Sequence, residues 1–221
     1  MSLPGAPAPV SRPMGFLSDI HGNLAALERV LDDLKGRDVR DVWVAGDLLF
    51  GGDRPLEVWQ LLTKHSAHCV RGLGDTALCM VDPDTLLPEN EQERSMSQLF
   101  VKTRRALGDL VVERLRRLPE KLRIPLIDGS EIVMVHGSPA DPSQEMSQDM
   151  TDAELSALVG DDPADIVVCG GSHVPFRRDL DDLSIINVGS VGAAPGGHTA
   201  HYAIITPRMD GARVEALYVE F

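Results

Sequence analysis

The chain is poor in cysteine, in aromatic residues and in basic residues. It has three cysteines among its 221 residues, and aromatic residues make up 4%. Three cysteines are too few, and odd in number, for a disulfide framework, so we expect a reducing cytoplasm as the location. Lysine and arginine total 21 against 34 acidic residues, which gives a net charge of −13. This balance excludes a protein that coats nucleic acid, because phosphate contacts need clustered basic side chains.

Long apolar runs are also missing. No stretch approaches the roughly 20 apolar residues of a membrane-spanning helix, so we expect no contact with a membrane. Residues 1–13 are rich in proline and alanine and lack the apolar core of a signal peptide, so we expect a flexible leader there. Residues 14–221 are long enough for one sizeable core and contain no repeat or linker, which predicts a single domain.

Short apolar runs alternate with segments of helical spacing, which is typical of an α/β protein. The pattern predicts strands at residues 14–17, 42–45, 68–70, 122–126, 132–135, 166–169, 184–188, 202–206 and 214–219. It predicts helices at residues 24–34, 55–62, 91–118 and 151–159, and a loop at 80–90. Asp128-Gly129 and Asp210-Gly211 each separate two strand-like runs and predict hairpins.

The segment 91–118 is the longest expected helix. Its basic side chains predict a solvated face. One apolar face is expected to consist of Leu107, Leu110, Val111, Leu115 and Leu118.

Side chains that can bind metal follow strand after strand. Asp19 and His21 follow the first predicted strand, Asp47 follows the second, and His136 and His173 follow two later ones. The carboxyl ends of buried strands are where open α/β sheets place their chemistry. Carboxylates with imidazoles suit Mn²⁺, Fe or Zn²⁺, and an open position suits hydrolysis. The alternative is that these residues only hydrogen bond within their turns.

In this order the segments resemble the motifs of the calcineurin-like metallophosphoesterase superfamily, in its small bacterial and archaeal phosphodiesterase-like branch. The family pattern runs D-x-H-G-N, G-D, G-N-H/C-D/E, H-G and G-H-x-H-x-P, followed by a late N-P-G-S-x-G turn. The corresponding segments are residues 19–23, 46–47, 72–75, 136–137, 170–175 and 187–192. The resemblance covers residues 15–221 and implies an α/β fold, a β-sandwich of two mixed sheets flanked by helices.

The resemblance also implies roles for the site residues. Asp19, His21 and His173 would bind one metal, and Asp47 would bridge two. The second metal would take His136, the Asn of the third motif and the first His of G-H-x-H. We expect Mn²⁺ as the metal, with Fe or Zn²⁺ as alternatives.

Three further residues are candidates for contact with a substrate. Asn23 either caps the first helix or contacts a bound anion, and with Asp75 it is a candidate catalytic residue. Arg71 pairs either with a substrate phosphate or with Asp75.

The sequence departs from the family pattern at three positions. Leu73 replaces the Asn, Gly74 replaces the His or Cys that would assist the leaving group, and Gly171 replaces the first His of G-H-x-H. The second site keeps only Asp47 and His136, so we expect one tightly held metal. Two classes of function follow.

The first class is a metal-dependent phosphoesterase that hydrolyses a small phosphoester with metal-activated water. The alternative is a catalytically impaired or inactive protein of the same fold with a binding or regulatory role. His198 and His201 either supply a substitute ligand or are ordinary loop and strand residues. The sequence leaves the oligomeric state open, with a homodimer as one possibility.

Overall fold

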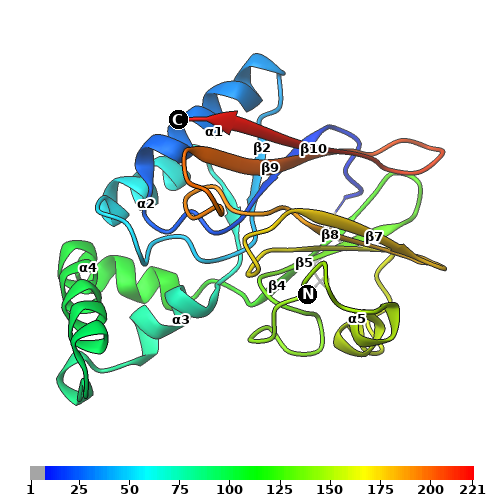
Figure 1. Cartoon of the computed structure of the whole chain (residues 1–221). Helices are drawn as coiled ribbons and strands as arrows, with labels where there is room; N and C mark the ends of the chain where they lie inside the picture. Colours follow the sequence, from blue (N-terminus) through cyan, green and yellow to red (C-terminus); the bar gives the residue numbers. More distant parts are fainter. Residues whose placement is uncertain (1–7) are drawn as a thin grey trace, which may run out of the picture.

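The computed structural model describes residues 8–221. Within these residues two five-stranded sheets pack face to face, with helices outside them (Figure 1). This is the expected α/β sandwich of two mixed sheets.

The first sheet has the strand order β10-β9-β1-β2-β3. Its first three strands in the chain are parallel, β9 runs antiparallel beside β1, and β10 runs antiparallel beside β9. The strands are β1 (Met14–Leu17), β2 (Asp41–Val44), β3 (His68–Cys69), β9 (Thr199–Thr206) and β10 (Arg213–Glu220).

The second sheet has the order β4-β5-β6-β8-β7. Strands β5, β6 and β8 are parallel, and β4 and β7 are antiparallel edge strands. The strands are β4 (Lys121–Pro125), β5 (Glu131–Val135), β6 (Ile166–Cys169), β7 (Phe176–Leu180) and β8 (Leu183–Asn187). Both predicted hairpins, β4–β5 and β9–β10, are confirmed.

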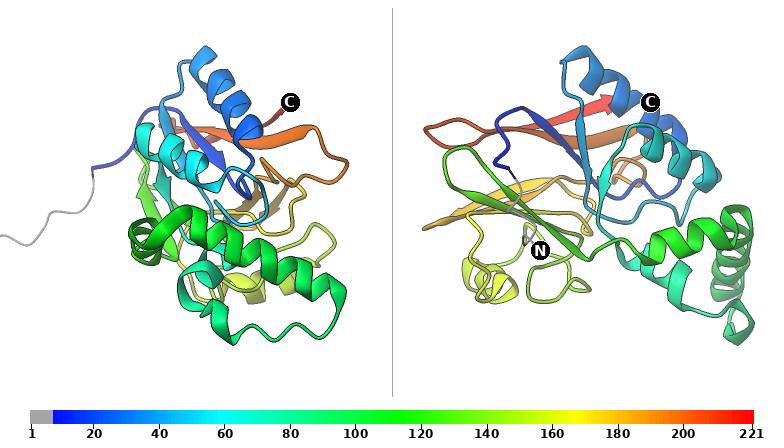
Figure 2. Two further views of the ribbon diagram at one scale, coloured as in Figure 1. Left: turned by 90° about the vertical axis from the view of Figure 1, so that its left-hand side faces the viewer. Right: turned by 180° about the vertical axis from the view of Figure 1, so that it is seen from behind.

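The helices lie in three regions around the two sheets. α1 and α2 cover the outer face of the first sheet, α5 covers the outer face of the second, and α3 and α4 lie at one end of both (Figures 1 and 2). The helices are α1 (Leu24–Gly36), α2 (Pro55–Lys64), α3 (Leu73–Met80), the 3₁₀ turn η1 (Pro83–Thr85), α4 (Glu91–Arg116) and α5 (Asp152–Val159). Among the described residues no helix has the length and apolarity needed to cross a membrane.

The core between the sheets follows from strand alternation. Ile132 and Met134 of β5 join the apolar cluster between the sheets, whereas Val133 and Val135 pack on the outer side with α5. Strand β6 alternates in the same way. Both sheets therefore contribute to the inner cluster.

Two elements longer than a single turn were not predicted. Gly72 and Gly74 indicate a turn where α3 begins, but Asp75 stabilises the start of this helix by accepting a hydrogen bond from Gly72 N at 3.1 Å. Strand β7 begins one residue after Pro175, and it pairs antiparallel with β8.

Two further expectations were wrong in detail. Gly108 lies at φ 68° inside α4 and kinks it, which changes the direction in which later side chains point, and Leu110 is 67% exposed rather than buried. The flexible leader was expected to reach residue 13, but Val10 forms a bridge with Leu126 and donates to Pro125 O at 2.8 Å. Residues 1–7 of that leader lie outside the described residues.

Candidate metal centre

The loops after the parallel strands of both sheets meet at one edge of the sandwich. The β1 loop is bonded to the β2 loop through two backbone hydrogen bonds, Asp19 N to Gly46 O at 3.0 Å and His21 N to Asp47 O at 2.9 Å. The β6 loop reaches the same point from the second sheet, since Gly171 N donates to Asp19 Oδ2 at 2.9 Å. The two sheets therefore bring the predicted ligands together.

The backbone at four of these ligands is strained. Residues 8–221 contain seven non-glycine residues with positive φ. Four of the seven are Asp19 at 54°, His21 at 49°, Asp47 at 50° and His173 at 60°. Such conformations cost roughly 1–3 kcal/mol each and concentrate at functional sites, where the surrounding structure holds them. The strain thus falls on the residues that the sequence singles out.

The first donor group consists of Asp19, His21 and His173. The two imidazole Nε2 atoms are 3.1 Å apart. Asp19 Oδ1 lies 3.2 Å from His173 Nε2 and 3.6 Å from His21 Nε2. Ligand atoms about 2.1 Å from a tetrahedral metal lie about 3.4 Å apart, so this triangle fits three ligands of one ion.

The hydrogen bonds around this group leave its inner atoms free. His21 Nδ1 is 2.7 Å from Phe50 O, which places a proton on Nδ1 and leaves Nε2 facing the group as the atom that can bind a metal. Asp19 Oδ1 is buried and has no hydrogen-bond partner among the described residues. An unpaired buried carboxylate oxygen is costly, and a cation between it and the imidazoles removes that cost.

The charges of the group support the same conclusion. Burial would raise the pKa of Asp19, but the neighbouring imidazoles of His173 and His21 outweigh burial and hold the pKa well below its ordinary value. Burial would lower the pKa of His21, but the neighbouring Asp19 carboxylate and the Phe50 carbonyl raise it to about 9. The carboxylate thus favours positive charge beside it, and a metal ion would take the place of those imidazole protons.

The second donor group consists of Asp19, Asp47 and His136, all buried. His136 Nδ1 is 2.8 Å from Ala45 O, and its Nε2 is 3.6 Å from Asp47 Oδ2. Asp47 Oδ1 accepts a hydrogen bond from Gly74 N at 2.7 Å. The predicted ligands of the second metal therefore lie together, but one carboxylate oxygen is already engaged.

The motif glycines let the backbone lie directly against the ligands. A Cβ on Gly72 would lie 2.2 Å from Asp47 Oδ1, and one on Gly170 would lie 2.5 Å from Asp19 Oδ2. Leu73, at the position of the missing Asn, is the first residue of α3 and is 51% exposed. Within residues 8–221 neither His198 nor His201 belongs to either donor group.

Asn23 has one of the two roles that the sequence left open, that of helix cap. Its Oδ1 accepts from Ala26 N at 3.2 Å and caps α1, and its Nδ2 donates to Gly192 O at 3.3 Å. The side chain also lines the cavity beside the first donor group. Its catalytic role stays a prediction.

Asp75 is fully buried, and its carboxylate accepts hydrogen bonds from two backbone N–H groups. Its carboxylate accepts from Leu48 N at 3.1 Å and from Gly72 N at 3.1 Å, which connects the β2 loop to the start of α3. Burial raises the pKa of Asp75 to about 6, and the nearby charge of Asp47 adds to the shift. This geometry suits a residue that positions the Asp47 loop rather than one that touches substrate.

Arg71 has protein partners for its side-chain nitrogens. It donates to Thr76 Oγ1 at 3.0 Å, to Arg116 O at 2.7 Å and to Glu120 Oε1 at 2.9 Å. The expected pairing with Asp75 is not among these contacts. Arg71 joins α3 to the end of α4 and is not part of the cavity lining.

A cavity of about 590 Å³ opens beside His21 and His173. One of its walls comes from α4, which supplies Leu99 and Lys102. These two residues were missed from the sequence, where the basic residues of 91–118 were read as a solvated face. No motif marks them, because they come from a helix far along the chain from the ligand loops.

Known proteins resemble this chain over most of its length. The calcineurin-like phosphoesterase superfamily domain matches residues 13–210. Uncharacterized protein MJ0912 of Methanocaldococcus jannaschii is 24% identical over 226 residues, which cover 94% of this chain and 87% of that protein.

Two solved structures are similar over nearly the whole chain. Hypothetical protein PH1004 from Pyrococcus horikoshii OT3 has a TM-score of 0.79 and 22% identity, covering 95% of this chain and 88% of that one. A metallophosphoesterase from Sphaerobacter thermophilus has a TM-score of 0.73 and 29% identity, covering 96% and 89%. The first likeness concerns the fold alone. With the family match over most of its length, the chain belongs to the calcineurin-like phosphoesterase superfamily.

Proposed function

We propose that this chain is a metal-dependent phosphoesterase of the phosphodiesterase type, with a divalent cation held by Asp19, His21 and His173. The observation that carries the proposal is the triangle of Asp19 Oδ1 and the two imidazole Nε2 atoms, with sides of 3.1, 3.2 and 3.6 Å. The unpaired state of Asp19 Oδ1 and the family membership support it.

The ligand loops supply what this reaction needs from the protein. A bound divalent cation lowers the pKa of water and neutralises charge on a phosphoryl oxygen. The Phe50 carbonyl fixes the ring of His21, and the Ala45 carbonyl fixes that of His136. The cavity beside His21 and His173 admits an ester to the exposed side of the group.

The proposal also covers the identity of the metal and the class of substrate. One carboxylate and two imidazoles suit Mn²⁺, with Fe or Zn²⁺ as alternatives, and the second donor group holds a further ion only weakly. The substrate is a small phosphoester. The free, buried Cys69, Cys79 and Cys169 fit the cytoplasmic location that we propose.

The test measures metal content and hydrolysis of bis(p-nitrophenyl) phosphate and p-nitrophenyl phosphate by the Mn²⁺-loaded protein. Replacement of a ligand with His173→Ala should lower turnover at least about 100-fold. His65→Ala, which changes an exposed histidine at the end of α2, is the matched control and should leave turnover unchanged. Turnover by the loaded wild type no higher than that of folded His173→Ala would overturn the proposal.

A further inference from the structure

Besides the imidazoles of the first donor group, the cavity beside it has one cationic side chain in its lining. This side chain is Lys102 of α4, and the loop residues Gly51, Gly52 and Asp53 line the same cavity. Lys102 is exposed. Near the two ends of this helix, Arg94 and Arg116 form ion pairs with glutamates of the same helix. Lys102 forms no ion pair within residues 8–221. Its charge is therefore available to a ligand.

The charge of Lys102 lies in strongly acidic surroundings. The site contains the buried carboxyl groups of Asp19, Asp47 and Asp75, and Asp53 adds another on the cavity wall. The whole chain carries a net charge of −13. A phosphate ester is an anion that such a field repels, so a basic group at the cavity mouth raises its local concentration and its affinity.

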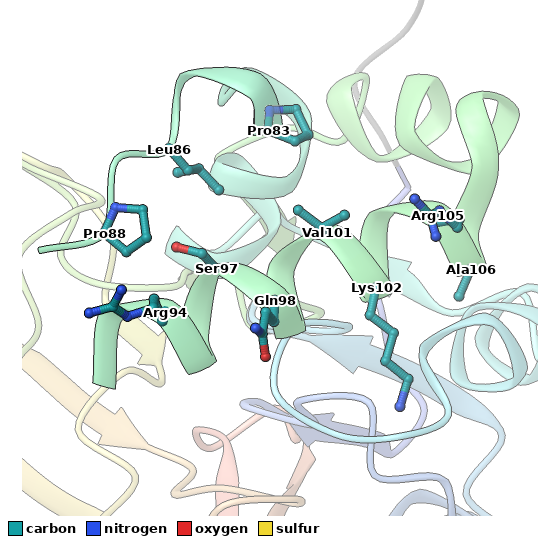
Figure 3. A pocket seen from close by; sticks show the side chains of 10 residues that line it. All are labelled: Pro83, Leu86, Pro88, Arg94, Ser97, Gln98, Val101, Lys102, Arg105 and Ala106. Atoms are coloured by element: carbon teal, nitrogen blue, oxygen red, sulfur yellow. The ribbon is translucent and has the colours of Figure 1, made fainter. Parts of the chain in front are cut away.

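Lys102 also lines a second cavity. This cavity, of about 660 Å³, lies along α4 beside the segment of residues 83–88 (Figure 3). Figure 3 shows Leu86 and Val101 on the two sides of the cavity, while Lys102 points from the helix away from Leu86. Most of the remaining lining is apolar or basic: Pro83, Pro88, Arg94, Arg105 and Ala106.

We propose that α4 is the substrate-recognition element of the site. Lys102 contacts the phosphate of the ester, and the cavity between Leu86 and Val101 takes the organic group that the phosphate carries. The favoured substrate is then a phosphodiester with at least one bulky apolar or aromatic group, since a lysine and an apolar wall complement those two parts. This inference rests on the proposed function and specifies the substrate class of the same site.

The first experiment removes the charge. Lys102→Met should raise KM for bis(p-nitrophenyl) phosphate and Kd for inorganic phosphate about 5- to 10-fold with little change in kcat, as expected for one partly exposed charge contact. Lys102→Arg should restore part of the affinity. The matched control is Lys64→Met, which removes an exposed lysine from α2 in a different cavity.

Calorimetric titration of the Mn²⁺-loaded protein with phosphate separates this inference from the proposed function. If no ester is hydrolysed but Lys102→Met still weakens phosphate binding, the proposed function fails and the contact stands. If the wild type hydrolyses the ester and Lys102→Met changes neither KM nor phosphate Kd, the contact is refuted.

The second experiment tests the apolar wall with neighbouring leucines. Leu86→Ser alters the cavity lining, whereas Leu87→Ser alters a side chain that is 87% exposed and outside that lining. Leu86→Ser should raise KM for bis(p-nitrophenyl) phosphate about 3- to 5-fold, as expected for losing part of one apolar contact, and leave Kd for inorganic phosphate, which carries no organic group, unchanged. Equal effects on the ester and on phosphate, or none on either, would overturn this part of the proposal.

Discussion

The two donor groups share Asp19 but differ in access. In the first group the imidazoles of His21 and His173 are 19% and 31% exposed and line a cavity. In the second group the side chains of Asp47 and His136 are only 11% and 3% exposed. A ligand can approach the first group directly, whereas the second is closed within the protein.

The two groups differ also in which atoms are free. Asp19 Oδ1 faces the first group without a hydrogen-bond partner, whereas Asp47 Oδ1 in the second accepts from Gly74 N. Gly171 N similarly donates to Asp19 Oδ2. Two of the positions that lost a family side chain thus supply a backbone N–H to a carboxylate. Loss of a ligand there leaves the carboxylates hydrogen bonded and the loops in place, so one site can weaken while the other persists.

The largest effect should come from removing the residue that the groups share. Asp19→Asn keeps the shape and can still accept from Gly171 N, but it removes the charge from both groups. We expect loss of bound metal and a fall in turnover of about 1,000-fold, which corresponds to about 4 kcal/mol in the barrier. Elemental analysis and phosphodiester hydrolysis measure the two effects.

Asp32→Asn is the matched control, because it makes the same change at an exposed position of α1. A folded Asp19→Asn protein with wild-type metal content would show that Asp19 is not a ligand of either group.

The grouping of the candidate ligands could be predicted because each lies at or just beyond the end of a buried strand. Asp19, Asp47 and His136 need only the rule that parallel strands bring their carboxyl ends to one edge. Lys102 could not be predicted, because its place depends on how α4 packs across the ends of the sheets. The kink at Gly108 is a second example: helical periodicity assumes one continuous helix, and the positive φ at that glycine interrupts it.

Restoring the donors that the second group lacks should remove the difference in metal binding between the two groups. Leu73→Asn with Gly171→His should raise the metal content from one ion to two. If the second ion lowers the barrier by about 2–3 kcal/mol, turnover should rise about 30- to 150-fold. Metal analysis and hydrolysis of the same phosphodiester give the result.

This double variant has a structural cost at Gly171. The residue lies at φ 81°, and a Cβ there would lie 3.2 Å from Glu145 Cβ. A side chain in that region costs about 1–2 kcal/mol, although His173 has φ 60° in the same loop. Leu73→Asn alone is the control. A folded double variant that binds two ions but is no faster would show that the missing ligands do not limit catalysis, and would direct attention to Gly74.

The difference in affinity between the groups should appear in thermal unfolding. Mn²⁺ at 100 times its Kd stabilises a folded protein by about 2.7 kcal/mol, which is roughly 5–10 °C in Tm for a chain of this size. His173→Ala, which damages only the first group, should abolish the shift. His136→Ala, which damages only the second, should keep most of it. The reverse order would place the tightly bound ion in the second group.

The smallest effect on the site should come from Arg71, which sequence reasoning proposed as a substrate-binding residue. Its hydrogen bonds to Thr76 and Glu120 and to the carbonyl of Arg116 make it a connection between α3 and α4. Arg71→Met should therefore lower the free energy of unfolding by about 1–3 kcal/mol and leave KM and metal content unchanged. Denaturant unfolding and steady-state kinetics separate the two effects.

Arg40→Met is the matched control for this change, because Arg40 is 87% exposed and pairs only with Asp38 two residues away. It should change stability by less than about 0.5 kcal/mol. If Arg71→Met instead raises KM while stability stays at the wild-type value, the guanidinium must leave its partners when substrate binds. In that case the α3–α4 junction would move toward the second donor group during turnover, and the two groups would differ in mobility as well as in access.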